Sequence, residues 1–201
     1  MKKFISMCMA LLVAASCTIS ASAANISHTV VKGDTMWKLA VKYEIGTSEI
    51  ISANPHISDP NLIYPGQVLT IPQLDSSVTS FEAEVVRLVN EIRVKNGLKA
   101  LTTNWELSRV ARYKSQDMVD NRYFSHTSPT YGSPYQMMRS FGISYRTAGE
   151  NIAYGYSTPQ AVVNAWMNSS GHRANILNSS YTQIGVGYVA KGNYWTQMFI
   201  G

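Results

Sequence analysis

The stretch Ala-Gly-Glu-Asn-Ile-Ala at residues 148–153, with Trp-Met-Asn-Ser-Ser-Gly-His-Arg-Ala-Asn-Ile-Leu at residues 166–177, carries the most informative chemistry of this sequence. It contains Glu150 and His172, and His126 lies 24 residues before Glu150. Two histidines and a glutamate can bind a divalent transition metal such as zinc and leave a fourth position open for water. Their spacing matches no short metal-binding motif, so this interpretation requires the fold to bring the three side chains together.

Two other interpretations of these residues stay open. In a structural one, Glu150 lies in a Gly-Glu-Asn turn, where its carboxylate caps backbone donors and a histidine supports it. In an enzymatic one, a Ser-His-Glu triad forms, for which the candidate nucleophiles are Ser125, Ser169 and Ser170. No Gly-x-Ser-x-Gly sequence surrounds any of these serines, so the serine mechanism has little support from the sequence.

The residues around this stretch predict helices followed by a β-hairpin. Four helices are predicted from capping-box spacing or from a proline at the first helical position, and they start at Thr79 with Glu82, Thr103 with Glu106, Ser133-Pro134 and Thr158-Pro159. Two β-rich runs, 184–190 and 194–200, flank a Lys-Gly-Asn turn and predict an antiparallel hairpin. Helices that cover an antiparallel hairpin indicate an α+β fold.

Residues 26–72 have turn signals of their own and predict a separate small unit. Two strands and two helices are predicted from β-branched runs and apolar periodicity: strand His28–Lys32, a helix capped by Asp34 or Thr35, a helix from about Thr47 that stops before Asn54-Pro55, and strand Val68–Ile71. The apolar stripe of the first helix includes Trp37, which the pattern places in the core.

The beginning of the chain has the form of a secretory signal. Residues 1–24 contain two lysines, an apolar run from Phe4 to about Ala15, and Ala21-Ser22-Ala23 as a cleavage site. The run is shorter than the ~20 residues that span a bilayer. We therefore expect no membrane association after the signal is removed.

The composition excludes several classes of protein. The 201 residues are 45% hydrophobic and 14% charged, which is typical of a folded chain with a core. Both cysteines, Cys8 and Cys17, lie in the predicted signal, so we expect the mature chain to have no disulfide, thiolate metal site or cysteine nucleophile. Without Lys2 and Lys3, 15 basic residues face 12 acidic ones, a net charge of +3. That excess is too small to indicate nucleic-acid binding.

Three sequence words in the first unit resemble a LysM domain. They are Val-Lys-Gly-Asp-Thr-Met-Trp-Lys-Leu-Ala at 31–40, Asn54-Pro55, and Tyr-Pro-Gly-Gln-Val-Leu-Thr-Ile-Pro at 64–72. The resemblance implies a βααβ fold that binds glycans containing N-acetylglucosamine, as in peptidoglycan or chitin. It places the glycan groove between two loops, which correspond here to Gly33, Asp34, Thr35 and Met36 and to Asn54, Pro55, His56 and Ile57.

Five ordered motifs in the second part resemble the CAP superfamily of cysteine-rich secretory, antigen 5 and pathogenesis-related proteins, in its bacterial form without disulfides. They lie at 123–127, 149–153, 165–177, 184–188 and 194–197. The resemblance implies an α-β-α sandwich with a central cleft lined by His126, Glu150 and His172, in which some members bind zinc or another divalent ion. His126 and His172 are therefore candidate metal ligands, and with Glu150 they are candidate catalytic residues. A second glutamate normally stands where this chain has Ser169, which removes one possible base and favours binding over catalysis.

These patterns predict a signal peptide at 1–24, a LysM glycan-binding domain at 26–72, a linker at 73–80 and a CAP domain at 81–201. We expect a secreted protein, associated with a cell wall or spore surface, that binds peptidoglycan or a chitin-type glycan and presents a His/Glu cleft. One alternative is a metal-assisted peptidase or wall hydrolase. Another is a spore-coat or envelope assembly factor that acts through protein contacts.

Overall fold

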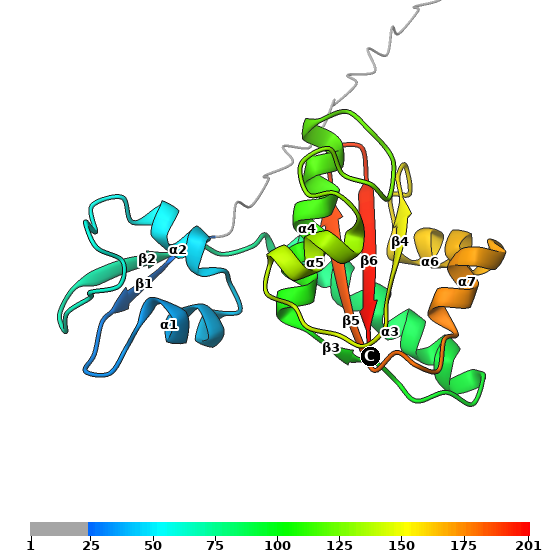
Figure 1. Ribbon diagram of the computed structural model, residues 1–201, viewed down its shortest axis with the longest axis horizontal. Helices are drawn as coiled ribbons and strands as arrows, with labels where there is room; N and C mark the ends of the chain where they lie inside the picture. Colours follow the sequence, from blue (N-terminus) through cyan, green and yellow to red (C-terminus); the bar gives the residue numbers. More distant parts are fainter. Residues whose placement is uncertain (1–23) are drawn as a thin grey trace, which may run out of the picture.

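The computed structural model describes residues 24–201. The predicted signal peptide, with Cys8 and Cys17, therefore lies outside the described residues apart from Ala24. The described chain forms a small N-terminal unit and a larger C-terminal unit joined by a short connection (Figure 1). Between residues 24 and 201, no helix combines the length and apolar character needed to cross a membrane.

The N-terminal unit has the predicted order of two strands and two helices, β1 Ile26–Thr29, α1 Met36–Tyr43, α2 Thr47–Ala53 and β2 Val68–Ile71. The strands pair antiparallel, and Thr35 caps α1 by accepting from the backbone N–H of Lys38 at 3.1 Å. Two expectations were wrong. The first strand ends at Thr29, before the predicted Lys32, and Trp37 is 66% exposed although its helix does bury Leu39 and Ala40.

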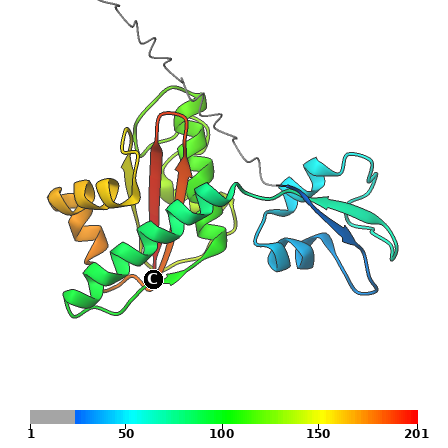
Figure 2. The same cartoon turned by 180° about the vertical axis from the view of Figure 1, so that it is seen from behind.

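The C-terminal unit is an α-β-α sandwich, as predicted. Its elements are α3 Ser76–Lys95, β3 Thr102–Thr103, α4 Trp105–Asp120, α5 Pro134–Ser140, β4 Ala148–Ala153, α6 Pro159–Asn168, α7 Ser170–Ile176, β5 Gln183–Val189 and β6 Tyr194–Ile200. The sheet has the order β3-β5-β6-β4. Helices α4 and α5 cover one face and α3 crosses the other, with α6 and α7 beyond β4 (Figures 1 and 2). Because β4 is the last strand in the order, it lies at the edge of the sheet.

Several helix starts match the sequence predictions and others differ. Ser133 and Gln136 form a capping box, Thr158 caps α6, and the hairpin of β5 and β6 forms as expected. Helix α3 instead begins at Ser76 with Asp75 as its cap, so residues 76–80 of the predicted linker are helical. Because α3 starts a turn early, the predicted capping box at Thr79 and Glu82 does not form.

Two further expectations about local structure were wrong. Asn104, not Thr103, caps α4 by accepting from the N–H of Leu107 at 2.9 Å. The predicted Gly-Glu-Asn turn is strand β4, because pairing with β6 holds these residues in an extended conformation.

An arginine of α4 connects the two units. Arg109 of α4 donates to Glu49 of α2 at 2.6 and 2.9 Å and to the Ser48 hydroxyl at 2.8 Å. Its guanidinium also lies over the rings of Tyr113 and Phe141, each centroid 5.2 Å away. The backbone approaches closely here, since a Cβ on Gly46 would lie 2.2 Å from Arg109 Nε. The N-terminal unit is thus held against α4 by directional contacts.

Candidate functional site

The fold brings His126 and Glu150 into direct contact. Glu150 lies in the middle of edge strand β4, and its side chain is 1% exposed. His126, from the loop after α4, donates from Nδ1 to Glu150 Oε1 at 2.7 Å and is 52% exposed. The other carboxylate oxygen, Oε2, is buried and has no hydrogen-bond partner among the described residues. A buried, incompletely bonded carboxylate thus orients an imidazole that solvent can reach, which is an arrangement suited to binding a ligand or moving a proton.

His172, the third residue of the predicted group, lies on α7. Burial lowers the pKa of His172, and the nearby His126 lowers it further. The backbone carbonyl of His172 accepts from the Asn151 amide at 3.1 Å. His172 therefore lies within electrostatic reach of His126 and favours its neutral form.

The arrangement does not form a three-ligand metal site. Within residues 24–201, no group of three or more His, Cys, Asp or Glu side chains is placed to hold an ion. His126 uses Nδ1 to bind Glu150, and Ser169, where the resemblance implied a second glutamate, lies at the junction of α6 and α7. Zinc binding by His126 and His172 therefore stays a prediction.

The structure also bears on the other interpretations of this stretch. The side chain of Glu150 accepts from no backbone donor among the described residues. The structural interpretation was therefore wrong about the capped turn, although a histidine does contact the carboxylate as it expected. Trp166 and Trp195 are buried in the core. Arg173 and Asn175 donate to backbone carbonyls, of Met167 at 3.3 Å and of Glu150 at 3.1 Å, and so support the chain around the site.

Lys114 supports the His126 loop from α4, a role that no motif in the sequence predicted. Its side chain is fully buried on α4, and Nζ donates to the carbonyls of Ser125 at 2.7 Å and His126 at 3.0 Å and to the Tyr123 hydroxyl at 3.0 Å. Burial lowers the pKa of Lys114, while Glu150 and other acidic groups act in the opposite direction. A lysine on the inner side of an amphipathic helix was the available sequence signal.

One turn further along α4, Asp117 anchors the rest of the same loop. It accepts from the hydroxyls of Ser128 at 2.7 Å and Thr130 at 2.6 Å and also from Tyr123. Lys114 and Asp117 together fix the loop that presents His126.

The predicted glycan-binding residues divide into exposed and buried ones. Gly33, Thr35, Pro55 and His56 are exposed, Asp34 and Ile57 are partly buried, and Met36 and Asn54 are buried. The Asn54 side chain donates to the carbonyls of Ile50 and Thr70, each at 2.7 Å, and accepts from the Thr70 N–H at 2.8 Å. Asn54 therefore joins α2 to β2, and its side chain is occupied by the fold.

Asp34 is also occupied within the unit. It accepts from His28 Nε2 and from the Val31 N–H, both at 2.9 Å. The hydrogen bond from Val31 is the main cause that lowers the pKa of Asp34, and the one from His28 adds to it. Asp34 and Asn54 thus shape the two loops, and the exposed neighbours remain free to contact a ligand.

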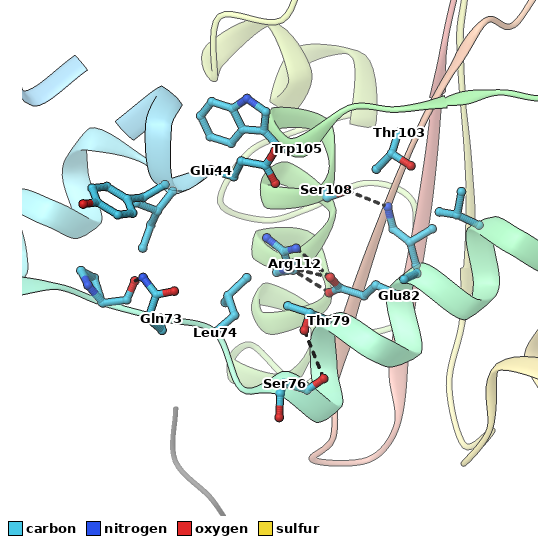
Figure 3. Close-up of a pocket in the computed structure, with 16 residues that line it drawn as sticks. Glu44, Gln73, Leu74, Ser76, Thr79, Glu82, Thr103, Trp105, Ser108 and Arg112 are labelled. Atoms are coloured by element: carbon cyan, nitrogen blue, oxygen red, sulfur yellow. Dashed lines mark hydrogen bonds and ion pairs between the residues drawn. The ribbon is translucent and has the colours of Figure 1, made fainter. Parts of the chain in front are cut away.

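A pocket of about 420 Å³ lies between the two units. Figure 3 shows Glu82 and Arg112 facing each other at its wall, with Leu74 and Glu44 on the opposite side. Arg112 donates to both oxygens of Glu82 at 2.7 to 3.0 Å, and the Tyr188 N–H donates to Oε1 at 3.0 Å. No pattern in the sequence predicted this pocket.

A βααβ unit followed by an α-β-α sandwich that pairs a histidine with a buried glutamate is the architecture of a LysM domain joined to a CAP domain. The family model "CAP: Cysteine-rich secretory protein family" matches residues 86–199, and the LysM domain model matches residues 28–72. The chain belongs to the CAP family and carries a LysM domain.

Three similar proteins illustrate the two parts. The protein YkwD of Bacillus subtilis (strain 168) is 61% identical over 132 residues, which are 66% of this chain and 51% of YkwD. The crystal structure of an extracellular protein with an SCP domain from Bacillus anthracis (strain Ames) has a TM-score of 0.60 and 35% identity, over 68% of this chain and 47% of that one. The secreted LysM effector ECP6 of Passalora fulva is 46% identical over 52 residues, 26% of this chain and 22% of the effector. The chain thus spans about half the length of the first two proteins.

Proposed function

We propose that this chain is a secreted, wall-associated protein whose LysM domain binds N-acetylglucosamine glycans of the peptidoglycan or chitin type. The observation that carries the proposal is the LysM match over residues 28–72. In addition, Gly33, Thr35, Pro55 and His56 are exposed on the two loops predicted to border the glycan groove. The secreted and extracellular descriptions of the LysM effector and the SCP-domain protein support the location.

The contact between the two domains means that glycan binding by the LysM domain also positions the CAP domain. Because Arg109 fixes the LysM unit against α4, a bound glycan holds the CAP domain at the same wall. A tethered domain acts at a raised local concentration without any new contact. The CAP domain then presents the His126–Glu150 pair to wall components. Envelope or spore-coat partners stay predictions.

Sedimentation with purified peptidoglycan tests the anchor. We expect residues 24–201 to co-sediment, and soluble N-acetylglucosamine oligomers to release them. The double variant Pro55→Ala, His56→Ala should be retained less, whereas Lys191→Ala, an exposed change in the β5–β6 turn, should behave as the parent chain. Absence of retention, or retention that the oligomers do not reduce, would contradict the proposal.

The His126–Glu150 pair favours a second candidate function, a wall hydrolase or peptidase. An exposed imidazole held by a buried carboxylate can take a proton from water or a hydroxyl. Release of soluble fragments from peptidoglycan by the parent chain, and its loss in His126→Ala and Glu150→Gln, would support this candidate. The same assay, repeated with added zinc and with a chelator, tests whether a metal is needed. It compares the parent chain with the double variant His126→Ala, His172→Ala. Equal release by the parent chain and the variants would exclude this role.

A further inference from the structure

Three aromatic side chains gather on the surface of the CAP domain close to the His126 loop. Phe124 is 45% exposed, Tyr154 is 56% exposed, and Tyr194 is partly buried. The ring centroids of Phe124 and Tyr154 are 4.7 Å apart, and those of Tyr154 and Tyr194 are 5.7 Å apart in a stacked arrangement. The third pair, Phe124 and Tyr194, is 6.5 Å apart. These three residues are called the aromatic platform below.

The strand register explains why the platform lies beside the His126–Glu150 pair. Ala153 of β4 pairs with Trp195 of β6, so the next residues, Tyr154 and Tyr194, face each other just beyond the ladder. Side chains alternate between the faces of a strand, which puts Tyr154 on the same face as Glu150. The loop after α4, the end of β4 and the start of β6 lie at one end of the sheet (Figure 1).

Phe124 joins this group from the His126 loop. It lies two residues before His126, on the segment that Lys114 holds through the carbonyls of Ser125 and His126. The same buried lysine therefore positions both the imidazole and one ring of the platform. The platform ring Phe124 and the imidazole of His126 therefore come from the same short segment of chain, and both side chains are exposed.

The platform is not required to build the core. The large aromatic side chains of the core, Trp166 and Trp195, are fully buried, whereas Phe124 and Tyr154 leave about half of their surfaces in solvent. The hydroxyls of Tyr154 and Tyr194 bond to no protein group within the described residues, in contrast to the Tyr188 hydroxyl, which donates to Asn193 at 2.6 Å. Exposed, clustered aromatic surface of this kind marks a binding site.

The charge and size of the aromatic platform indicate which class of ligand it can bind. The ring–cation pairs in the described part of the chain involve other rings, so the platform offers neutral ring faces and two free hydroxyls. An anionic polymer or lipid headgroup would require cations, which these three residues do not supply. A protein partner would need an interface of roughly 1,000 Å² or more, far more than three rings provide. A neutral sugar matches in charge and size, since its C–H face packs on a ring and its hydroxyls bond to tyrosine.

We propose that the aromatic platform binds a pyranose ring of a neutral N-acetylglucosamine glycan and places the neighbouring linkage beside His126 and Glu150. This second subsite rests on the proposed function, because the LysM domain supplies the glycan at high local concentration. The glycan would then contact the chain at two separated places. The LysM loops provide the anchor, and the platform orients a sugar beside the His126–Glu150 pair.

NMR titration of residues 24–201 with soluble N-acetylglucosamine oligomers separates the two sites. We expect shifts in the LysM loops and, independently, in Phe124, Tyr154 and Tyr194. In the double variant Phe124→Ala, Tyr154→Ala, the apparent affinity measured at Tyr194 should fall by about tenfold, the usual effect of losing aromatic stacking. Signals of the LysM loops should titrate as in the parent chain, which also shows that the variant is folded.

Two further variants make the test specific. Tyr154→Phe keeps the ring and removes one hydroxyl, so we expect a smaller loss of affinity than for alanine. Tyr135→Ala removes a 47% exposed aromatic side chain on α5, away from the platform, and should change nothing. Shifts in the LysM loops alone would overturn the platform proposal and leave the anchor standing. Shifts at neither place would overturn both.

Discussion

Glu82 and Glu150 are two buried glutamates of the same domain, and their surroundings differ sharply. They are 5% and 6% exposed. Both oxygens of Glu82 accept from Arg112, and one also accepts from the Tyr188 N–H. Glu150 accepts from the exposed His126 through one oxygen, and its other oxygen has no partner among the described residues. Burial alone therefore does not distinguish a structural carboxylate from a functional one.

The two carboxylates differ in how completely their oxygens are hydrogen-bonded. Burial raises the pKa of Glu82, although Arg112 acts in the opposite direction, and the complete set of donors joins α3, α4 and β5. A buried carboxylate left incompletely bonded costs folding free energy. Natural folds retain such a cost mainly where a site needs it. We therefore interpret Glu82 as part of the framework and Glu150 as part of the site.

The largest effect is expected for Glu82→Gln. The change removes the charge that compensates Arg112 and should lower the free energy of unfolding by about 3 kcal/mol, as for other broken buried ion pairs. Denaturant unfolding measures the loss. The matched control is Glu84→Gln on the exposed side of α3, where Glu84 pairs with Arg87, and it should cause no measurable change. A loss below ~1 kcal/mol for Glu82→Gln would contradict the framework role.

A smaller loss of stability is expected for Lys114→Met. Methionine fills the buried space but leaves the carbonyls of Ser125 and His126 without their donor, which should cost about 2 kcal/mol. Hydrogen exchange in the loop at residues 121–130 should accelerate more than exchange in the sheet. Lys191→Met, in the exposed hairpin turn, is the control. Uniform acceleration across the domain would show that Lys114 supports the whole core and not the His126 loop in particular.

The contact between the domains should weaken at low pH. Burial raises the pKa of Glu49, but hydrogen bonds from Arg109 and Ser48 outweigh it and hold the pKa below the ordinary value of 4.5. The contact therefore contributes fully above pH 4.5 and is lost as the pH falls through the lower pKa of the folded state. We expect a contribution of at most about 1 kcal/mol for this partly exposed pair.

Small-angle scattering between pH 6 and pH 3 measures this loosening as an increase in the radius of gyration. Glu49→Gln should show the looser form at every pH, and Gly46→Ala should resemble it, because the new Cβ would collide with Arg109. A radius that stays constant over this pH range in the parent chain would exclude the ion pair as the main link between the domains.

Local signals in the sequence predicted some parts of this fold well. The prolines after Ser133 and Thr158 and the Lys-Gly-Asn turn act within a few residues, so the starts of α5 and α6 and the hairpin could be predicted. Family motifs named His126, Glu150 and His172, and the structure brings His126 and Glu150 into contact.

Features that depend on distant partners could not be predicted in this way. Glu150 lies in a strand because β6 pairs with it, although its glycine and asparagine neighbours are typical of turns. Glu82 has the spacing of a capping residue but turns inward to Arg112 on another helix. Trp37 follows helical periodicity, yet the small first unit buries too little surface to cover it.

The smallest effect on stability is expected for Glu150→Gln, which repeats the Glu82 substitution in the other environment. The amide oxygen can still accept from His126, and the change removes a buried charge that was incompletely bonded, so the free energy of unfolding should stay within about 1 kcal/mol of the parent value. Denaturant unfolding beside Glu82→Gln gives the comparison directly, because both variants replace a buried carboxylate by an amide of the same shape. An equal loss in both would mean that Glu150 serves the framework, and the exposed imidazole of His126 would then have to be explained without a functional carboxylate behind it.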